Sequence, residues 1–195
     1  MDKIRERIFS SLEYGDPHRF LIELRKIEAT LSDVSMPENV RRLRTNGLKQ
    51  QREMRDAALL CVGISKRFGY QIRFAPTEDE DFDFVATWST SDTRHICRVQ
   101  LKEVAPEDLN PKSSIDDVLD SLAKYADPRD LTVAIRLNRT ARFEPASFAV
   151  PTNLAPGGLW VYGCVSKDHS KWAVWGDFVP ANGGAFETVF EYPTE

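Results

Sequence analysis

The hydrophobic periodicity of this chain changes once, close to residue 70, and that change limits the folds open to it. Up to residue 68 the apolar residues recur at intervals of three and four, which is the spacing of an amphipathic helix. Beyond residue 70 they form short alternating or β-branched stretches, which are typical of strands. The sequence therefore predicts a helical N-terminal part followed by a sheet.

The helical part contains two breaks. Residues 4–33 predict two helices separated at Gly15-Asp16-Pro17. The helical pattern resumes at residue 38 and runs to about residue 68, where Gly69 is a good C-cap. Because Gly47 weakens this stretch, we expect either one kinked helix or two.

The sheet part alternates with one more helix. Strands are expected at residues 70–74, 82–88, 95–104, 131–137, 147–151, 159–166 and 171–179, and a helix at residues 113–128. The helix between the third and fourth strands has the length of a parallel crossover, and the last two strands suggest a hairpin. We predict an α/β fold with a mixed sheet, divided into a helical extension (residues 1–37) and an α/β domain (residues 38–195).

The composition is that of a globular intracellular protein. Of the 195 residues, 42% are hydrophobic and 29% are charged, so the chain is not expected to be disordered. No apolar run approaches the roughly 20 residues of a membrane span, and the N-terminus lacks the apolar core of a signal peptide. Three widely spaced cysteines are expected to be small buried hydrophobes. We expect a cytoplasmic protein with no membrane partner.

Polar residues interrupt one expected strand at a regular spacing. In CRVQLKEV, residues 97–104, Gln100 and Lys102 lie two apart and so on one face. Asp83 lies at the head of the preceding strand, which the polar turn STSD joins to this one as a hairpin-like pair. We therefore expect Asp83 close to Gln100 and Lys102, with Glu53 of the preceding helix at the same end.

These residues and their order resemble the PD-(D/E)xK, or restriction-endonuclease-like, nuclease superfamily. Its core order is αβββαβ, which residues 53–137 reproduce, and its motif is a helical acid, an Asp opening the second strand, and Glu-x-Lys in the third. Gln100-Leu101-Lys102 is similar to the Gln-x-Lys variant of Mrr-like members. The full expectation is an αβββαβ core with a mixed sheet, an N-terminal helical extension and a C-terminal β-hairpin.

The resemblance implies a Mg²⁺-dependent (or Mn²⁺-dependent) nuclease that hydrolyses phosphodiester bonds in DNA, with RNA as a second substrate to consider. Asp83 would bind the metal through its carboxylate and Gln100 through its amide oxygen, while Lys102 would orient the attacking water and counter the developing charge. Glu53 would hold a second metal or a metal-bound water. Because Gln replaces Glu, we expect weaker metal affinity. Many nucleases that cut two strands act as pairs, so a homodimer is a further expectation.

Other residues compete for these roles. Asp81 is the less favoured substitute for Asp83 as a metal ligand, and Asp56 could replace Glu53. Three residues at the end of the fourth strand are additional candidates for the site: Arg136, Asn138 and Arg139. Three tryptophans could stack on bases but more often form core: Trp160, Trp172 and Trp175.

The charge distribution bears on nucleic-acid binding. The net charge is −4 overall but +4 over residues 1–67, where a basic run could contact backbone phosphates or form a solvated helix face. Its candidates are Arg41, Arg42, Arg44, Lys49 and Arg52. The alternative function is a catalytically inactive nuclease-fold protein that acts as a nucleic-acid- or protein-binding module. An unrelated α+β interaction domain is the third hypothesis.

Overall fold

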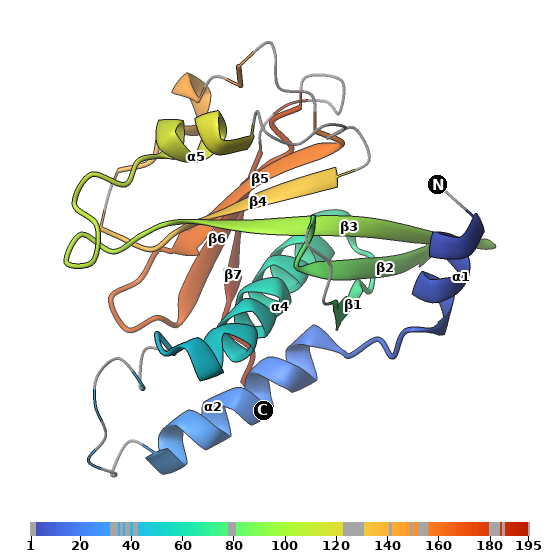
Figure 1. Ribbon diagram of the computed structural model, residues 1–195, viewed down its shortest axis with the longest axis horizontal. Helices are drawn as coiled ribbons and strands as arrows, with labels where there is room; N and C mark the ends of the chain where they lie inside the picture. The colour runs from blue at the N-terminus through green and yellow to red at the C-terminus, as the bar shows by residue number, and fades with distance from the viewer. Residues whose placement is uncertain are drawn as a thin grey trace.

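A mixed seven-stranded sheet with helices on both faces forms the protein (Figure 1). The computed structural model describes residues 3–31, 35, 37, 40, 43–77, 81–122, 131–140, 142–148, 150–151, 156–179, 184 and 186–194. The helices in these residues are α1 (Lys3–Ser11), α2 (Pro17–Leu31), α4 (Lys49–Phe68) and α5 (Ile115–Leu122). None of the helices described here is long and apolar enough to cross a bilayer.

The strands lie in the sheet in the order in which they occur along the chain. They are β1 (Arg73–Pro76), β2 (Phe84–Thr90), β3 (Thr93–Val104), β4 (Leu131–Leu137), β5 (Gly158–Cys164), β6 (Lys171–Gly176) and β7 (Phe186–Glu191). The β3–β4 and β4–β5 pairs are parallel and the other pairs are antiparallel. The α/β class and the mixed sheet are therefore confirmed.

Alternation along the strands gives the sheet two apolar faces, and each face has its own core. In β4, Ala134 belongs to the cluster beneath α4, whereas Val133 and Ile135 belong to the cluster beneath α5. Helix α4 approaches the sheet closely at Gly63, where an added Cβ would lie 2.8 Å from the Phe190 ring and 2.9 Å from a methyl group of Val174. Only a residue without a side chain allows this contact with β6 and β7.

The N-terminal helices pack onto the domain. Leu21 of α2 is completely buried in the core beneath α4, and its carbonyl accepts a 3.2 Å hydrogen bond from the Tyr192 hydroxyl near the C-terminus. Phe9 of α1 belongs to the opposite core, where its ring packs against Phe82. Residues of the expected extension thus contribute to both cores.

The observed elements differ from the expected ones in three places. Within the described residues, the helical stretch expected from residue 38 to about 68 is interrupted at residues 43–45 and by a 3₁₀ turn at Asn46–Leu48 that includes Gly47, and α4 begins at Lys49. The strand expected at residues 147–151 is wrong, because a 3₁₀ turn occupies Pro145–Ser147 and no strand follows in the described residues there. Strand β7 was not expected, whereas β5 and β6 form the expected hairpin.

Candidate functional site

Strands β2 and β3 separate where Asp83 enters the sheet. The last backbone pair of the β2–β3 ladder is Phe84 with Val99. One residue earlier, the side chain of Asp83 takes the place of a backbone acceptor on β2: its Oδ2 accepts a 2.6 Å hydrogen bond from the Leu101 backbone N–H. The Asp83 N–H in turn donates to the Val99 carbonyl at 2.9 Å. Asp83 is therefore held at the fork by main-chain geometry.

Gln100 contacts the same carboxylate oxygen. Its Nε2 donates a short hydrogen bond to Asp83 Oδ2 and a second one, of 3.2 Å, to the Leu101 carbonyl. Since both partners are acceptors, the amide nitrogen must be the group that faces them. For Gln100 to share a cation with Asp83 Oδ2, its side-chain amide would have to rotate by about half a turn, so that the amide oxygen faces the carboxylate in place of the nitrogen.

Three charged side chains surround this contact. Lys102 lies on the same face of β3 as Gln100, and the positive charges of Lys102 and Lys49 lower the pKa of Asp83, while the negative charge of Glu53 raises it. Lys49 and Glu53 form an ion pair of 3.3 Å on the first turns of α4. In the register, Gln100 and Lys102 pair with Val133 and Ile135 and so lie on the α5 side of the sheet, whereas Lys49 and Glu53 belong to α4 on the other side. The charges of Lys102, Lys49 and Glu53 all reach Asp83, and we call these four residues together with Gln100 the Asp83 site.

The charge of the Asp83 carboxylate is only partly compensated. Burial raises its pKa most, the hydrogen bond from Leu101 lowers it, and Glu53 raises it further, so that the net shift is upward. Its second oxygen, Oδ1, has no hydrogen-bond partner among the described residues. A cation bound at this oxygen would stabilise the ionised form.

The competing acids lie elsewhere. Asp81 is exposed in the segment before β2 rather than on the strand. Asp56 of α4 is buried and forms a 2.6 Å ion pair with Arg136 of β4, so it does not substitute for Glu53. No three His, Cys, Asp or Glu side chains converge in a metal-sized group within the described residues. The proposed ligand set has two carboxylates and one amide.

The basic run does not form one exposed face. Arg44 makes a bidentate pair with Glu103 at 2.6 and 2.7 Å, and Arg52 donates to the Leu43 carbonyl at 3.2 Å. Lys49 is exposed, while Arg41 and Arg42 lie outside the described residues. The three tryptophans proposed for base stacking are buried core residues: Trp160, Trp172 and Trp175.

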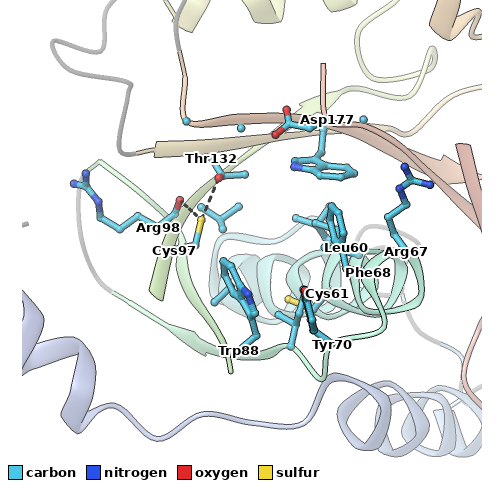
Figure 2. A pocket seen from close by; sticks show the side chains of 18 of the residues that line it. Leu60, Cys61, Arg67, Phe68, Tyr70, Trp88, Cys97, Arg98, Thr132 and Asp177 are labelled. Carbon is cyan, nitrogen blue, oxygen red and sulfur yellow. Dashed lines mark hydrogen bonds between the residues drawn. The ribbon is translucent and has the colours of Figure 1, made fainter. Parts of the chain in front are cut away.

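A cavity of about 640 Å³ that the sequence did not reveal lies on the α4 face of the sheet (Figure 2). We call it the apolar cavity; aromatic rings form much of its wall: Phe68, Tyr70, Trp88, Trp160 and Phe186. The Cys97 thiol lies 3.1 Å from the Thr132 hydroxyl, and burial raises its pKa, which disfavours the nucleophilic thiolate. The Asp177 carboxylate accepts the backbone N–H groups of Leu159 and Val179. These contacts suit apolar binding and not acid–base chemistry.

A second cavity, of about 670 Å³, is lined by five arginines. We call it the arginine cavity; its arginines are Arg25, Arg44, Arg55, Arg136 and Arg139. Asn138 also lines it and donates to Glu103 at 2.6 Å. The candidates at the end of β4 thus gather around this cavity, together with residues of α2 and α4 that sequence spacing could not connect to them.

No family model, no curated protein and no solved structure matches this chain.

Proposed function

We propose that the protein is a Mg²⁺-dependent nuclease of the PD-(D/E)xK type that hydrolyses phosphodiester bonds in DNA. The observation that carries the proposal is the contact between Asp83 and Gln100 at the β2–β3 fork, with Lys102 on the same strand face and Glu53 nearby. The order α4, β1, β2, β3, α5, β4 supports it, because it is the αβββαβ order of that superfamily. The three free cysteines accord with action in the reducing cytoplasm.

Each side chain has a role that follows from its chemistry. Asp83 would bind the metal through Oδ1, since Oδ2 already accepts two N–H groups. Gln100 positions Asp83 and, with its amide turned over, would offer the metal a carbonyl oxygen. Bound Mg²⁺ would polarise the phosphate and lower the pKa of a bound water.

Two further groups would act around the reacting phosphate. Lys102 would donate to the attacking water or to the phosphoryl oxygens, where negative charge develops. Glu53 would accept a hydrogen bond from a metal-bound water in place of its ion pair with Lys49. That pair is easily given up because the Lys49 side chain is largely exposed. Both roles use charges that already influence Asp83.

The test is plasmid cleavage with Mg²⁺ or Mn²⁺, with Asp81→Asn as the matched control because Asp81 is an exposed acid two residues from Asp83. We expect Asp83→Ala and Lys102→Ala each to lower the rate by at least about 10²-fold, and Asp81→Asn to leave it unchanged. Cleavage that persists in both alanine variants would refute the assignment. Wild-type protein that retains DNA in a salt-sensitive manner without cutting it would favour the inactive binding module.

A further inference from the structure

The arginine cavity contains a guanidinium whose hydrogen bonds are unmet. The Arg55 side chain on α4 is only 18% exposed, yet its nearest carboxylate oxygens are Asp56 Oδ1 at 3.8 Å and Glu28 Oε1 at 3.9 Å. Both distances exceed those of hydrogen bonds. Its Nε has no partner within the described part of the chain. Burying a cation whose N–H donors have no acceptor destabilises the fold, and a bound anion would remove that cost.

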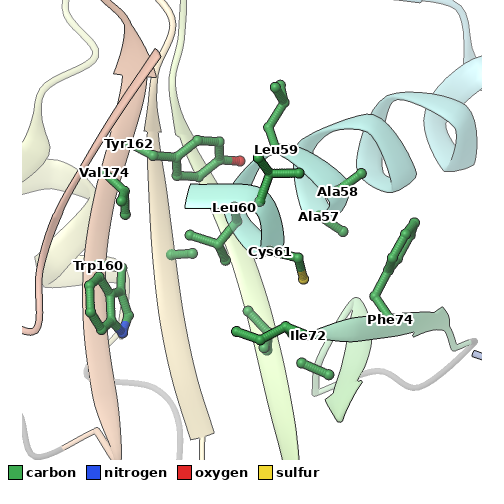
Figure 3. Packing of buried hydrophobic residues seen from close by; sticks show 14 of the residues in the cluster. Ala57, Ala58, Leu59, Leu60, Cys61, Ile72, Phe74, Trp160, Tyr162 and Val174 are labelled. Carbon is green, nitrogen blue, oxygen red and sulfur yellow. The ribbon is translucent and has the colours of Figure 1, made fainter. Parts of the chain in front are cut away.

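The neighbouring acid cannot serve Arg55 because it is already committed. Asp56 Oδ1 accepts a 2.6 Å hydrogen bond from Arg136, whose Nε is also without a partner in the described structure. The third such buried atom is the hydroxyl of Tyr162, which lies opposite Arg136 in the β4–β5 pair and points toward α4 (Figure 3). The unmet buried polar atoms of the described side chains are thus one cluster.

The two arginines of this cluster are unequally compensated. Burial and the charge of Arg136 lower the pKa of Arg55, more than Asp56 and Glu28 raise it. Burial lowers the pKa of Arg136 as well, but Asp56 and other acidic partners outweigh it and hold the pKa above its ordinary value. Asp56 therefore compensates Arg136 and leaves Arg55 only partly compensated, by the longer contacts to Asp56 and Glu28.

Most of the other acidic residues that line the cavity are exposed or already hydrogen-bonded. Glu107 and Asp108 are exposed, and Asp168 accepts hydrogen bonds from Ser166 and Ser170. Of the described acids that line the cavity, Glu28 is the one close to Arg55. Arg139 donates to the Ala105 and Asn110 carbonyls, and Arg25 stacks on Tyr192 with its guanidinium 4.1 Å from the ring centre. None of these contacts gives either arginine a carboxylate partner.

We propose that the arginine cavity binds a phosphate group, with Arg55 as its principal ligand and Arg139 and Arg25 at its sides. The paired N–H donors of a guanidinium group match the oxygens of phosphate. A buried guanidinium that has no acceptor is stabilised most when such an anion binds. The cavity and the Asp83 site use neighbouring residues of the same two elements: Arg55 is two residues from Glu53 on α4, and Glu103, which pairs with Arg44, follows Lys102 on β3 with its side chain on the opposite face of the strand. The phosphate would belong to the DNA strand cut at Asp83, an assignment that rests on the proposed function.

The first test uses inorganic phosphate as the probe and calorimetry as the measurement. We expect Arg55→Gln to weaken phosphate binding at least about tenfold and Arg142→Gln to bind like wild type, because Arg142 is 91% exposed and does not line the cavity. Phosphate should also raise the Tm of the wild type and not that of Arg55→Gln. Equal phosphate affinity in wild type and Arg55→Gln, or no binding to either, would overturn the proposal.

A thermal control separates a binding role from a structural one. Without phosphate, we expect Arg55→Gln to unfold at the wild-type Tm or above it, since it removes a buried charge that is only partly compensated. A markedly lower Tm would show that the long contacts to Glu28 and Asp56 stabilise the fold, and would refute the idea that Arg55 awaits an anion.

The second test identifies the source of the phosphate. In an Asp83→Asn background without metal, an oligonucleotide should bind more weakly when Arg55→Gln is added, and competing inorganic phosphate should displace it. Phosphate binding without oligonucleotide binding would support the anion site and overturn its assignment to a DNA strand. Because neither binding assay requires cleavage, the phosphate site can stand even where the nuclease proposal fails, and the reverse also holds.

Discussion

The Asp83 site and the arginine cavity leave charges of opposite sign unmatched. At the fork, a half-buried carboxylate is held mainly by neutral N–H donors and its pKa is raised by burial. In the cavity, a mostly buried guanidinium lies beyond hydrogen-bond distance of any carboxylate described here. Two other arginines of the cavity form well matched pairs, Arg44 with Glu103 and Arg136 with Asp56. Unmatched charge thus occurs where a ligand of opposite sign, a metal cation or a phosphate, is proposed to bind.

Loss of one partner from a matched pair should cost the most stability. Asp56→Asn should lower the free energy of unfolding by about 3–5 kcal/mol, because it leaves the buried Arg136 guanidinium without its counter-charge. Urea unfolding followed by circular dichroism measures the loss, and Arg55→Gln provides the unmatched control. If Asp56→Asn and Arg55→Gln had the same free energy of unfolding, the Asp56–Arg136 pair would contribute no more to stability than the long contacts of Arg55.

A second charge change sharpens the description of the Asp83 site. Gln100→Glu replaces the amide that donates to Asp83 with a second carboxylate, so the Tm should fall without metal. Mg²⁺ should reverse that loss, and its affinity should rise by roughly tenfold, because the cage gains a negative charge. Calorimetry and thermal melts with Mg²⁺ or EDTA measure both effects. Unchanged affinity would show that residue 100 is not a ligand.

The smallest expected effect concerns the stability of the Asp83 site itself. Asp83→Asn removes the desolvated charge and keeps an acceptor for the Leu101 N–H, so at neutral pH the Tm should rise by about 2–4 °C, the equivalent of roughly 1 kcal/mol in a chain of this size. Because the folded-state pKa of Asp83 is raised, the native wild type binds more protons than the unfolded chain between the ordinary and the raised pKa. Wild-type stability therefore falls as pH rises through that window.

Melts of the two proteins at several pH values test this directly. The advantage of Asp83→Asn should be absent in acid, where Asp83 is protonated, and should grow toward neutral pH. An advantage that is constant with pH would have a cause other than the charge of Asp83.

The Asp83 site was accessible from sequence because its parts are local. The alternation that puts Gln100 and Lys102 on one face needs only a strand, and a short turn fixes the β2–β3 register that brings Asp83 opposite them. The amide orientation of Gln100 was not accessible, since it depends on two acceptors that only the folded fork supplies. The nuclease assignment built on this site stays a prediction.

The arginine cavity and β7 show what sequence patterns miss. Asp56 looked like a substitute for Glu53, but its partner Arg136 lies 80 residues away and was brought to it by the β3–β4 crossover. Residues Phe186–Glu191 have a largely exposed pattern with one buried residue, Phe190, so their apolar alternation is weak. In the segment expected as a strand at residues 147–151, Pro145 and Pro151 limit backbone pairing on either side.

The closest approach between α4 and the sheet has a mechanical consequence. Gly63 brings the backbone of α4 directly against the side chains of Val174 on β6 and Phe190 on β7, and the same helix carries Glu53 and Arg55 at its other end. Any side chain at position 63 would lift the helix at this pivot and tilt its far end, moving the acid of one site and the cation of the other together. A shift of α4 would therefore change both proposed ligand sites at once, since each takes one of its charged residues from this helix.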